Sequence, residues 1–214
     1  MRTEEAEAGT AAPRLTRKGR ATRDRIAAAA AALMFEHGVA GTTIEDVQEA
    51  AEVSPSQIYH YFKDKQSLVR AVIAHQTGMV LGAFGSAEPR YSRLDSMEAL
   101  RAWRDFGVTL QKARDCAGGC PIGSLGSELA EADSSAREDV AAGFALWEKS
   151  LRDGLHAMRD RGELRPEADP DRLGLALLTT LQGGLLLTQI RRDTLALEAG
   201  LDTVLDYIES LRTS

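Results

Sequence analysis

Apolar residues recur at three- and four-residue spacing from the first ordered part of the chain onward, which is the period of an amphipathic helix. This pattern predicts a first helix over about residues 22–37. Its inward positions are Ile26, Ala29, Ala30, Leu33 and Met34. Gly38 follows and ends the helix, because glycine adopts the left-handed backbone of a helix end at little cost.

Two short helices separated by a tight turn are predicted between residues 42 and 68. Thr43 caps the first, Glu52 and Val53 make the turn, and Ser54 caps the second, which begins at Pro55. The inward apolar residues are Ile44, Val47 and Ala51 in the first helix, and Ile58 and Phe62 in the second. The outer face of the second helix is polar and aromatic, as in a helix-turn-helix that enters the major groove of DNA.

The remaining chain has the same helical period. Helices are predicted over about residues 66–84, 97–113, 134–160, 171–192 and 195–211, with a short one from Pro121. No alternating pattern bounded by hairpin signals indicates a strand. The sequence therefore predicts an all-α fold, in which an N-terminal three-helix unit is joined by a long helix to a C-terminal helical domain for ligand binding and dimerisation.

Residues 22–76 resemble the DNA-binding domain of the tetracycline-repressor (TetR) family of bacterial transcription regulators. The matching pieces, in order, are Phe35 and Gly38, Thr42-Thr43-Ile44, Asp46-Val47, Val53-Ser54, and Tyr59-His60-Tyr61-Phe62 with Lys65 and Leu68. Residues 1–15 are rich in Ala, Glu and Thr, a composition that predicts a disordered tail. The resemblance implies a helix-turn-helix domain over 16–65 and a ligand-binding and dimerisation domain over 66–214. Two positions depart from the family pattern: Glu52 replaces the usual turn glycine, and Gln48 replaces a small residue.

Charge is distributed unevenly along the chain. The net charge of the whole sequence is −6, which alone argues against a nucleic-acid partner. Residues 13–25, however, carry six basic side chains against one acidic, whereas residues 76–214 carry 16 basic and 22 acidic. A basic arm beside the helix-turn-helix can neutralise phosphates while the acidic body resists non-specific binding. The alternative is a disordered tail that only improves solubility.

The expected DNA contacts come from the basic arm, the helix-turn-helix and the start of the following helix. They are Arg17, Lys18, Arg20, Thr42, Thr43, Ser54, Pro55, Ser56, Gln57, Tyr59, His60, Tyr61 and Lys65. Gln57 and Tyr59 are expected at base edges or the groove wall, and Tyr61 and Lys65 at phosphates. Thr43 and Ser56 add contacts to the DNA backbone.

Two sets of apolar residues are predicted to act in the C-terminal domain. Aromatic and flexible side chains on two long helices are expected to line a ligand pocket: Trp103, Phe106, Leu110, Phe144, Trp147, Leu151 and Met158. Stripes on the last two helices are expected to form a four-helix dimer interface: Leu173, Leu177, Leu181, Gly184, Leu185, Thr188, Leu201, Val204, Leu205, Ile208 and Leu211. Packing within one subunit explains both sets as well.

Catalytic and metal-binding patterns are missing from the sequence. No HExxH, GxSxG or phosphate-binding loop occurs, and Cys116 and Cys120 lack the two further ligands that zinc would need. We therefore expect no enzyme activity, no metal and no cofactor. The segment from Gly119 to Leu125 is similar to one in TetR-family regulators that respond to electrophiles or to several drugs, although Ser124 stands where that branch has asparagine. A thiol sensor at the cysteines and a small buried packing residue remain alternatives.

The sequence also predicts solubility and location. We expect no signal peptide. We also expect no apolar run of membrane-spanning length, because polar and glycine residues interrupt 173–187. The combined hypothesis is a cytoplasmic homodimer that binds double-stranded operator DNA, does not bind membranes, and is released by a small apolar or electrophilic inducer. The runner-up hypothesis is a regulator switched by redox chemistry or electrophiles at Cys116 and Cys120.

Overall fold

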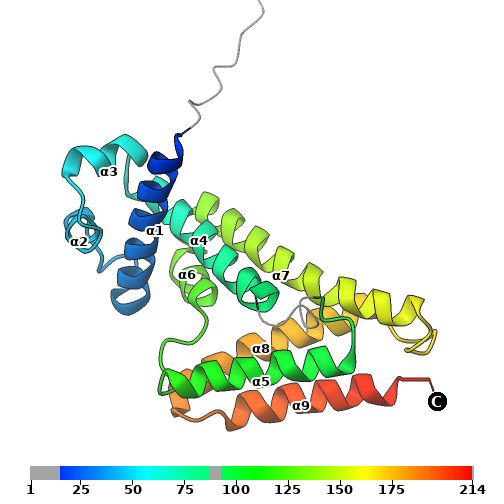
Figure 1. The fold of residues 1–214 in the computed structure, drawn as a ribbon. Coiled ribbons are helices and arrows are strands. Elements are labelled where there is room, and N and C mark those ends of the chain that lie inside the picture. The colour runs from blue at the N-terminus through cyan, green and yellow to red at the C-terminus, as the bar shows by residue number, and fades with distance from the viewer. Residues whose placement is uncertain (1–14, 87–92, 214) are drawn as a thin grey trace, which may run out of the picture.

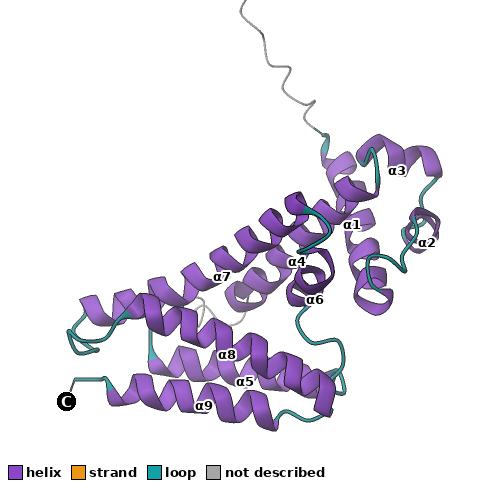
Figure 2. Cartoon of the chain, turned by 180° about the vertical axis from the view of Figure 1, so that it is seen from behind, coloured by secondary structure: helices purple, strands orange, loops and turns teal. Residues whose placement is uncertain are grey.

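The computed structural model describes residues 15–86 and 93–213, and these residues form helices connected by short loops. The helices are α1 (Arg17–His37), α2 (Ile44–Ala50), α3 (Pro55–Tyr61), α4 (Lys65–Ser86), α5 (Met97–Ala113), α6 (Pro121–Leu129), α7 (Ser134–Asp160), α8 (Pro170–Arg191) and α9 (Leu195–Ser210). Figure 2 shows no strand among these residues; an isolated bridge pairs Leu164 with Arg212. The predicted all-α fold is confirmed, while the predicted disordered tail lies almost wholly outside the described residues.

The helices are arranged in two groups joined by a pair of long ones (Figure 1). Helices α1, α2 and α3 form one end of the molecule. Helix α4 packs against α1 at that end and continues beside α7, while α7 packs in turn on α8. Helices α5 and α8 pack with α9 at the opposite side, and α6 lies between the two groups, against α4 and α7. A shift of α4 or α6 would therefore reach α1, α2 and α3.

Local capping explains most helix starts. Ser96, Asp133 and Asp169 each accept a backbone N–H of the first turn of α5, α7 and α8, as the N-cap position requires. The first helix was predicted to begin near Thr22, but α1 begins at Arg17. Thr16 is its N-cap, with the side chain accepting the N–H of Gly19. Residues 17–21 are rich in basic side chains and have no helical spacing of apolar residues, so the sequence pattern did not predict that they are helical.

Helix α8 differs from its prediction. It is long and apolar enough, by length and composition, to cross a membrane, although the sequence was expected to contain no such run. Less than half of its apolar window is buried. The buried part packs on α7 and α9 within the helical bundle, as the core helix of a folded domain does. The rest of its apolar surface is exposed.

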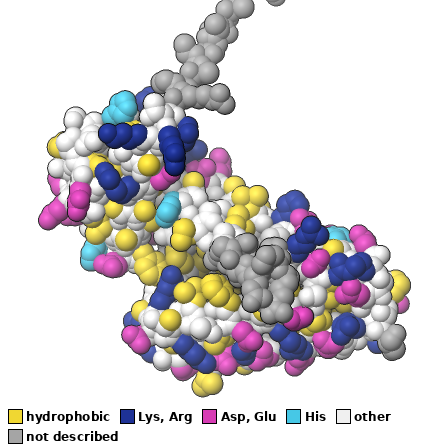
Figure 3. All heavy atoms as spheres, viewed as in Figure 1, with side chains coloured by type: hydrophobic (Ala, Val, Ile, Leu, Met, Phe, Trp, Pro, Cys, Tyr) yellow, Lys and Arg dark blue, Asp and Glu magenta, His cyan; other side chains and the backbone are white. Residues whose placement is uncertain are grey.

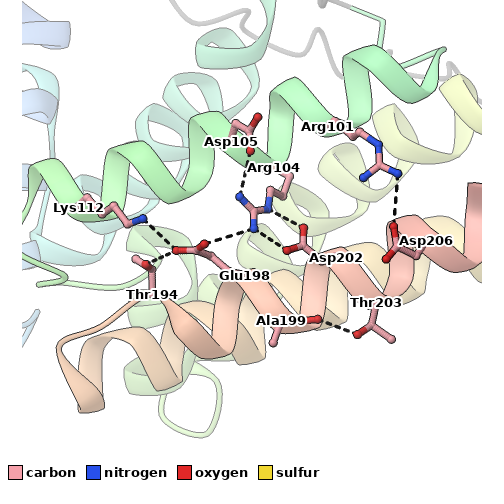
Figure 4. Close-up of polar contacts among 10 residues, drawn as sticks. All are labelled: Arg101, Arg104, Asp105, Lys112, Thr194, Glu198, Ala199, Asp202, Thr203 and Asp206. Carbon is pink, nitrogen blue, oxygen red and sulfur yellow. Dashed lines mark hydrogen bonds and ion pairs between the residues drawn. The ribbon is translucent and has the colours of Figure 1, made fainter.

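Charged side chains hold α9 against α5 (Figure 4). The Arg104 guanidinium donates to both carboxylate oxygens of Asp202, at 2.8 and 2.7 Å, and also contacts Glu198. Lys112 contacts the same Glu198 at 3.0 Å. Arg104 is mostly buried, and its hydrogen bonds to Asp202 help to raise its pKa against the opposing effect of desolvation. A planar, two-pronged contact of this kind is stronger than an exposed ion pair.

Arg104→Met is expected to lower the free energy of unfolding by about 1–2 kcal/mol, because Met keeps the apolar stem but loses the charged hydrogen bonds. Urea unfolding at a fixed protein concentration measures this loss. Arg101→Met is the matched control, since Arg101 and its partner Asp206 are both largely exposed and such a pair contributes about 0.5 kcal/mol or less. Equal midpoints for both variants would show that Arg104 does not stabilise the α5–α9 contact.

Candidate nucleic-acid interface and regulatory cavities

Helices α2 and α3 form a helix-turn-helix with a reciprocal cap at the start of each helix. Thr43 Oγ1 accepts the Asp46 N–H at 3.1 Å, and the Asp46 carboxylate accepts the Thr43 N–H at 2.8 Å. The Thr43 hydroxyl and then the Thr43 N–H, which both donate to the Asp46 carboxylate, lower the pKa of Asp46. Ser54 and Gln57 make the same exchange at α3, with Gln57 Oε1 accepting the Ser54 N–H at 2.9 Å. Both caps fix where the helices begin.

The turn between these helices has the backbone that its family position requires. Glu52 adopts a φ of 51°, in the left-handed region. A residue with a Cβ is less stable there than glycine by roughly 1 kcal/mol. Glu52 therefore adopts the left-handed conformation that a turn glycine would supply, and backbone bonds from Glu52 to Glu49 and from Val53 to Gln48 close the turn.

The outer face of α3 is exposed, as predicted. Ile58 and Phe62 are buried, whereas Pro55, Ser56, Tyr59 and His60 face solvent. Tyr59 is 57% exposed, the largest apolar surface on this face. Gln57 is also exposed, but its carbonyl oxygen is occupied by the cap, which leaves only its amide N–H₂ to donate.

Several predicted DNA contacts are buried or have partners within the chain. Thr42 is 1% exposed and donates to the Gly38 carbonyl at 2.8 Å, so its prediction as a side-chain contact is wrong. Thr43 is exposed, but its hydroxyl donates to Asp46. Tyr61 is half-buried and packs against the core, with its ring edge-on to His60. Lys65, the first residue of α4, is half-buried as well.

Basic side chains gather at the same end of the molecule (Figure 3). Arg17, Lys18 and Arg20 are exposed on the first turn of α1. Arg20 also donates to the Leu15 carbonyl at 2.7 Å, which orders this side chain. Arg23 lies over the Phe62 ring at 5.2 Å and joins α1 to the end of α3. The N-terminal turn of α1 and the exposed face of α3 thus belong to one compact unit.

A large cavity in the C-terminal domain has a volume of about 990 Å³ and is open to solvent. Helices α6, α7 and α8 line it, through Cys120, Gly123, Ser124, Ser127, Glu128, Phe144, Leu178, Thr179, Gln182, Gly183, Leu185, Leu186 and Gln189. Phe144 is the one member of the seven predicted pocket residues among those that line this cavity. An apolar wall with a few polar groups is typical of sites for small molecules.

A second cavity of about 80 Å³ lies between α5, α7 and α8 and shares Cys120 and Leu185 with the first. Trp103, Phe106, Leu110 and Trp147 line it, as predicted for a pocket. Leu151 and Met158 do not line it, because both are fully buried in the hydrophobic core. The two long helices do not pack mainly on each other: α5 packs mainly on α9, and α7 on α8 and α4.

Cys116 and Cys120 are both buried, with only 7% of each residue's surface exposed. Cys120 is the N-cap of α6, and its Sγ accepts the Gly123 N–H at 3.3 Å. Desolvation nevertheless raises the pKa of the Cys120 thiol, against the smaller lowering effects of its hydrogen bonds. The thiol is therefore kept in its neutral, less nucleophilic form. A thiol sensor would need an accessible Cys120, but this side chain is buried, and the geometry gives the sensor hypothesis no support.

The stripes predicted as a dimer interface are mostly interior. Leu177, Leu201, Leu205 and Ile208 have no exposed surface, and Leu173, Leu181, Leu185 and Thr188 are also buried within the single chain. Gly184 lies against Leu197, where an added Cβ would come within 2.9 Å of its backbone. Val204 and Leu211 are half-buried. A partner subunit cannot cover surface that α7, α8 and α9 already bury, so these residues pack the subunit core.

A different apolar face of α8 and α9 is exposed. Its large members are Leu175, Leu186, Leu187, Ile190, Leu195 and Tyr207, which are between 38% and 70% exposed. On α8, Leu175, Leu186 and Ile190 lie outside the buried stripe and were not among the residues predicted for the interface. Exposed apolar residues of this number on two neighbouring helices are typical of an interaction site.

Glu128, on α6, was not predicted as functional. Its two carboxylate oxygens accept the backbone N–H groups of Val39 and Ala40, at 2.8 and 2.7 Å, in the loop between α1 and α2. It also lines the 990 Å³ cavity. No local pattern could have indicated this role, because the partners are separated by 88 and 89 residues.

The chain is similar in sequence and in fold to known bacterial regulatory proteins. Residues 26–72 match the family described as "Bacterial regulatory proteins, tetR family", and residues 96–204 match "Tetracyclin repressor-like, C-terminal domain". The "HTH-type transcriptional repressor DhaR" of Mycobacterium sp. strain GP1 is 26% identical, over 82% of this chain and 86% of that protein. An uncharacterized HTH-type regulator of Lactococcus lactis is 26% identical, over 90% and 95% of the two chains. The crystal structure of a TetR regulator from Chloroflexus aurantiacus superposes with a TM-score of 0.77, at 29% identity, over 93% and 100%.

Proposed function

The chain belongs to the tetR family of bacterial regulatory proteins, and from this premise we propose that it is a cytoplasmic homodimeric repressor that a small molecule releases from its operator. The family relation supports operator binding and dimer formation in general. Repression is favoured by the relative DhaR, whose name describes a transcriptional repressor. Nothing in this function requires catalysis, a metal or a cofactor.

The observation that carries the proposal is the exposed face of α3. A capped helix presents Ser56, Tyr59 and His60 to solvent, beside the exposed basic turn of α1. Polar and aromatic side chains on a second helix of this geometry suit the edges of bases in the major groove, and basic side chains suit phosphates. The DNA-binding domain is assigned to residues 16–65 and the regulatory domain to residues 66–214.

Dimerisation is assigned to the exposed apolar face of α8 and α9, with a second copy of the chain as its occupant. Leu186, Ile190 and Leu195 are each more than half exposed. A twofold axis through this face would place α8 of one subunit against α8 or α9 of the other, so that four helices bury their apolar surface together. The two α3 helices would then lie in successive major grooves of a near-palindromic site.

Release is assigned to a ligand in the C-terminal domain. The 990 Å³ cavity is large enough for a drug-sized molecule. A ligand that binds more tightly when the two DNA-binding domains are wrongly spaced would shift the dimer toward that state, and DNA would bind more weakly by the same coupling free energy. Helices α4 and α6 connect the cavity region to α1.

Selection from a library of random DNA duplexes tests the proposed function. We expect enrichment of an inverted repeat whose half-site centres lie about one helical turn, or a multiple of one turn, apart. Binding should weaken steeply with salt, since phosphate contacts release counterions. A small-molecule screen against the selected duplex then seeks an inducer. Enrichment of no sequence, or of an RNA instead of duplex DNA, would overturn the proposal.

A further inference from the structure

Glu128 joins the wall of the large cavity to the loop that precedes the helix-turn-helix. Its carboxylate accepts the N–H groups of Val39 and Ala40, which follow the end of α1. The same loop ends at Thr42 and Thr43, where α2 begins. A movement of the Glu128 side chain therefore acts directly on the backbone that positions α2 and α3.

A second contact crosses the same joint. The Phe35 ring of α1 lies against Gly118 in the loop before α6, so closely that a Cβ on Gly118 would come within 2.0 Å of the ring. A third cavity, of about 90 Å³, separates α1 and α4 from α6 beside Glu128. Phe35 and Glu128 both line this cavity, so the joint between α1 and α6 is incompletely filled, and the Glu128 side chain has room to change partners.

The charge of the large cavity limits what can bind there. Among the described residues that line it, Glu128 bears the single full charge, and Ser124, Ser127, Thr179, Gln182 and Gln189 add neutral polar groups. A carboxylate or phosphate ligand would meet a like charge with no compensating Lys or Arg on the cavity wall. A positively charged donor would meet an acceptor of opposite charge beside apolar surface.

The present partners of Glu128 can be exchanged. The carboxylate lies just beyond the C-terminal end of α1, where the helix dipole disfavours negative charge. It is held there by two backbone N–H groups, of which the Val39 bond is partly buried and the Ala40 bond is exposed. An ammonium group forms a charge-assisted hydrogen bond that is stronger than a bond to a neutral amide.

Resting on the proposed function, we infer that the ligand of the large cavity is a small molecule with an apolar body and an ammonium group, and that it acts by withdrawing the Glu128 carboxylate from Val39 and Ala40. Loss of these two bonds frees the loop between α1 and α2. The DNA-binding domain then loses its fixed orientation relative to α6, and the two α3 helices of the dimer no longer match the operator.

Matched ligand pairs test the class of ligand without DNA. Each pair shares one apolar body and differs in its end group: 3-phenylpropylamine against 3-phenylpropionate, and 2-naphthylmethylamine against 2-naphthoate. Calorimetry at neutral pH is expected to show binding of the amines, at least about tenfold tighter than that of the acids. Glu128→Gln should lower amine affinity by about tenfold, whereas Glu131→Gln, an exposed site on the turn after α6, should not. Equal binding of amines and acids, or binding of neither, would overturn the ligand class.

Hydrogen exchange tests the transmission step. The amides of Val39 and Ala40 are expected to exchange about tenfold faster in Glu128→Ala than in the wild type or Glu131→Ala, because both acceptors are lost. The bound amine should produce the same acceleration in the wild type. Unchanged exchange in either case would refute the Glu128 mechanism. Since neither measurement contains DNA, these outcomes are separate from failure to find an operator, which would refute the proposed function instead.

Discussion

Ile190→Arg is expected to give a folded monomer that binds operator DNA at least about 100-fold more weakly than the wild type. Ile190 is 68% exposed on α8, so arginine there disturbs no packing within the subunit. In a twofold interface each substitution appears twice, and the buried, unpaired charges oppose association. A monomer holds one half-site and loses the gain in effective concentration that links the two α3 helices.

Sedimentation at micromolar concentration and circular dichroism measure this outcome together. Met79→Arg is the matched control, because Met79 is 58% exposed on α4 and not on the proposed interface helices. The Met79→Arg protein should remain dimeric. Leu181→Arg makes a second contrast. Leu181 is 4% exposed, so this variant is expected to unfold instead of dissociating. An Ile190→Arg protein that stays dimeric would exclude this face of α8.

The dimer interface shows where the sequence pattern was sufficient and where it was not. Helical spacing correctly identified Leu173, Leu177 and Leu181 as one face of a helix. It could not say what covers that face, because burial by α7 and α9 and burial by a second subunit leave the same spacing. Helix α8 has apolar residues on more than one face, and the more regular stripe was predicted as the interface. In the folded chain that stripe is buried, which is why the interface is proposed on the exposed residues instead.

Residues far apart in the sequence account for the other differences. The caps at Thr43 and Ser54 were predicted because their partners lie three residues away. The cavity and the Glu128 contact depend on how α6 is placed between α1, α7 and α8, which no local spacing encodes. Leu151 and Met158 were assigned to a pocket for the same reason: their helix face was known, but its neighbour was not. Cys120 illustrates a conflict of effects, in which desolvation outweighs a helix N-terminus.

Lys65→Ala is expected to weaken binding evenly across operator variants, because a phosphate contact carries no sequence information. The slope of affinity against salt concentration should fall by about one for each lost contact, or about two in the dimer. This variant is the reference for a second substitution on the face of α3. A change of sequence preference in Lys65→Ala would place Lys65 at a base instead of a phosphate.

Tyr59→Ala is expected to reduce operator affinity by about 1–3 kcal/mol per half-site and to relax the preference at one base position in each half-site. Tyr59 is 57% exposed and has no capping role, so alanine removes its contact with the groove and leaves α3 intact. Gln57→Ala is a poorer test, since it also removes the Ser54–Gln57 cap. Titrations with duplexes altered at single positions measure the effect. If Tyr59→Ala weakens every duplex equally, as Lys65→Ala should, then Tyr59 contacts the DNA backbone and the sequence is recognised by other residues of α3.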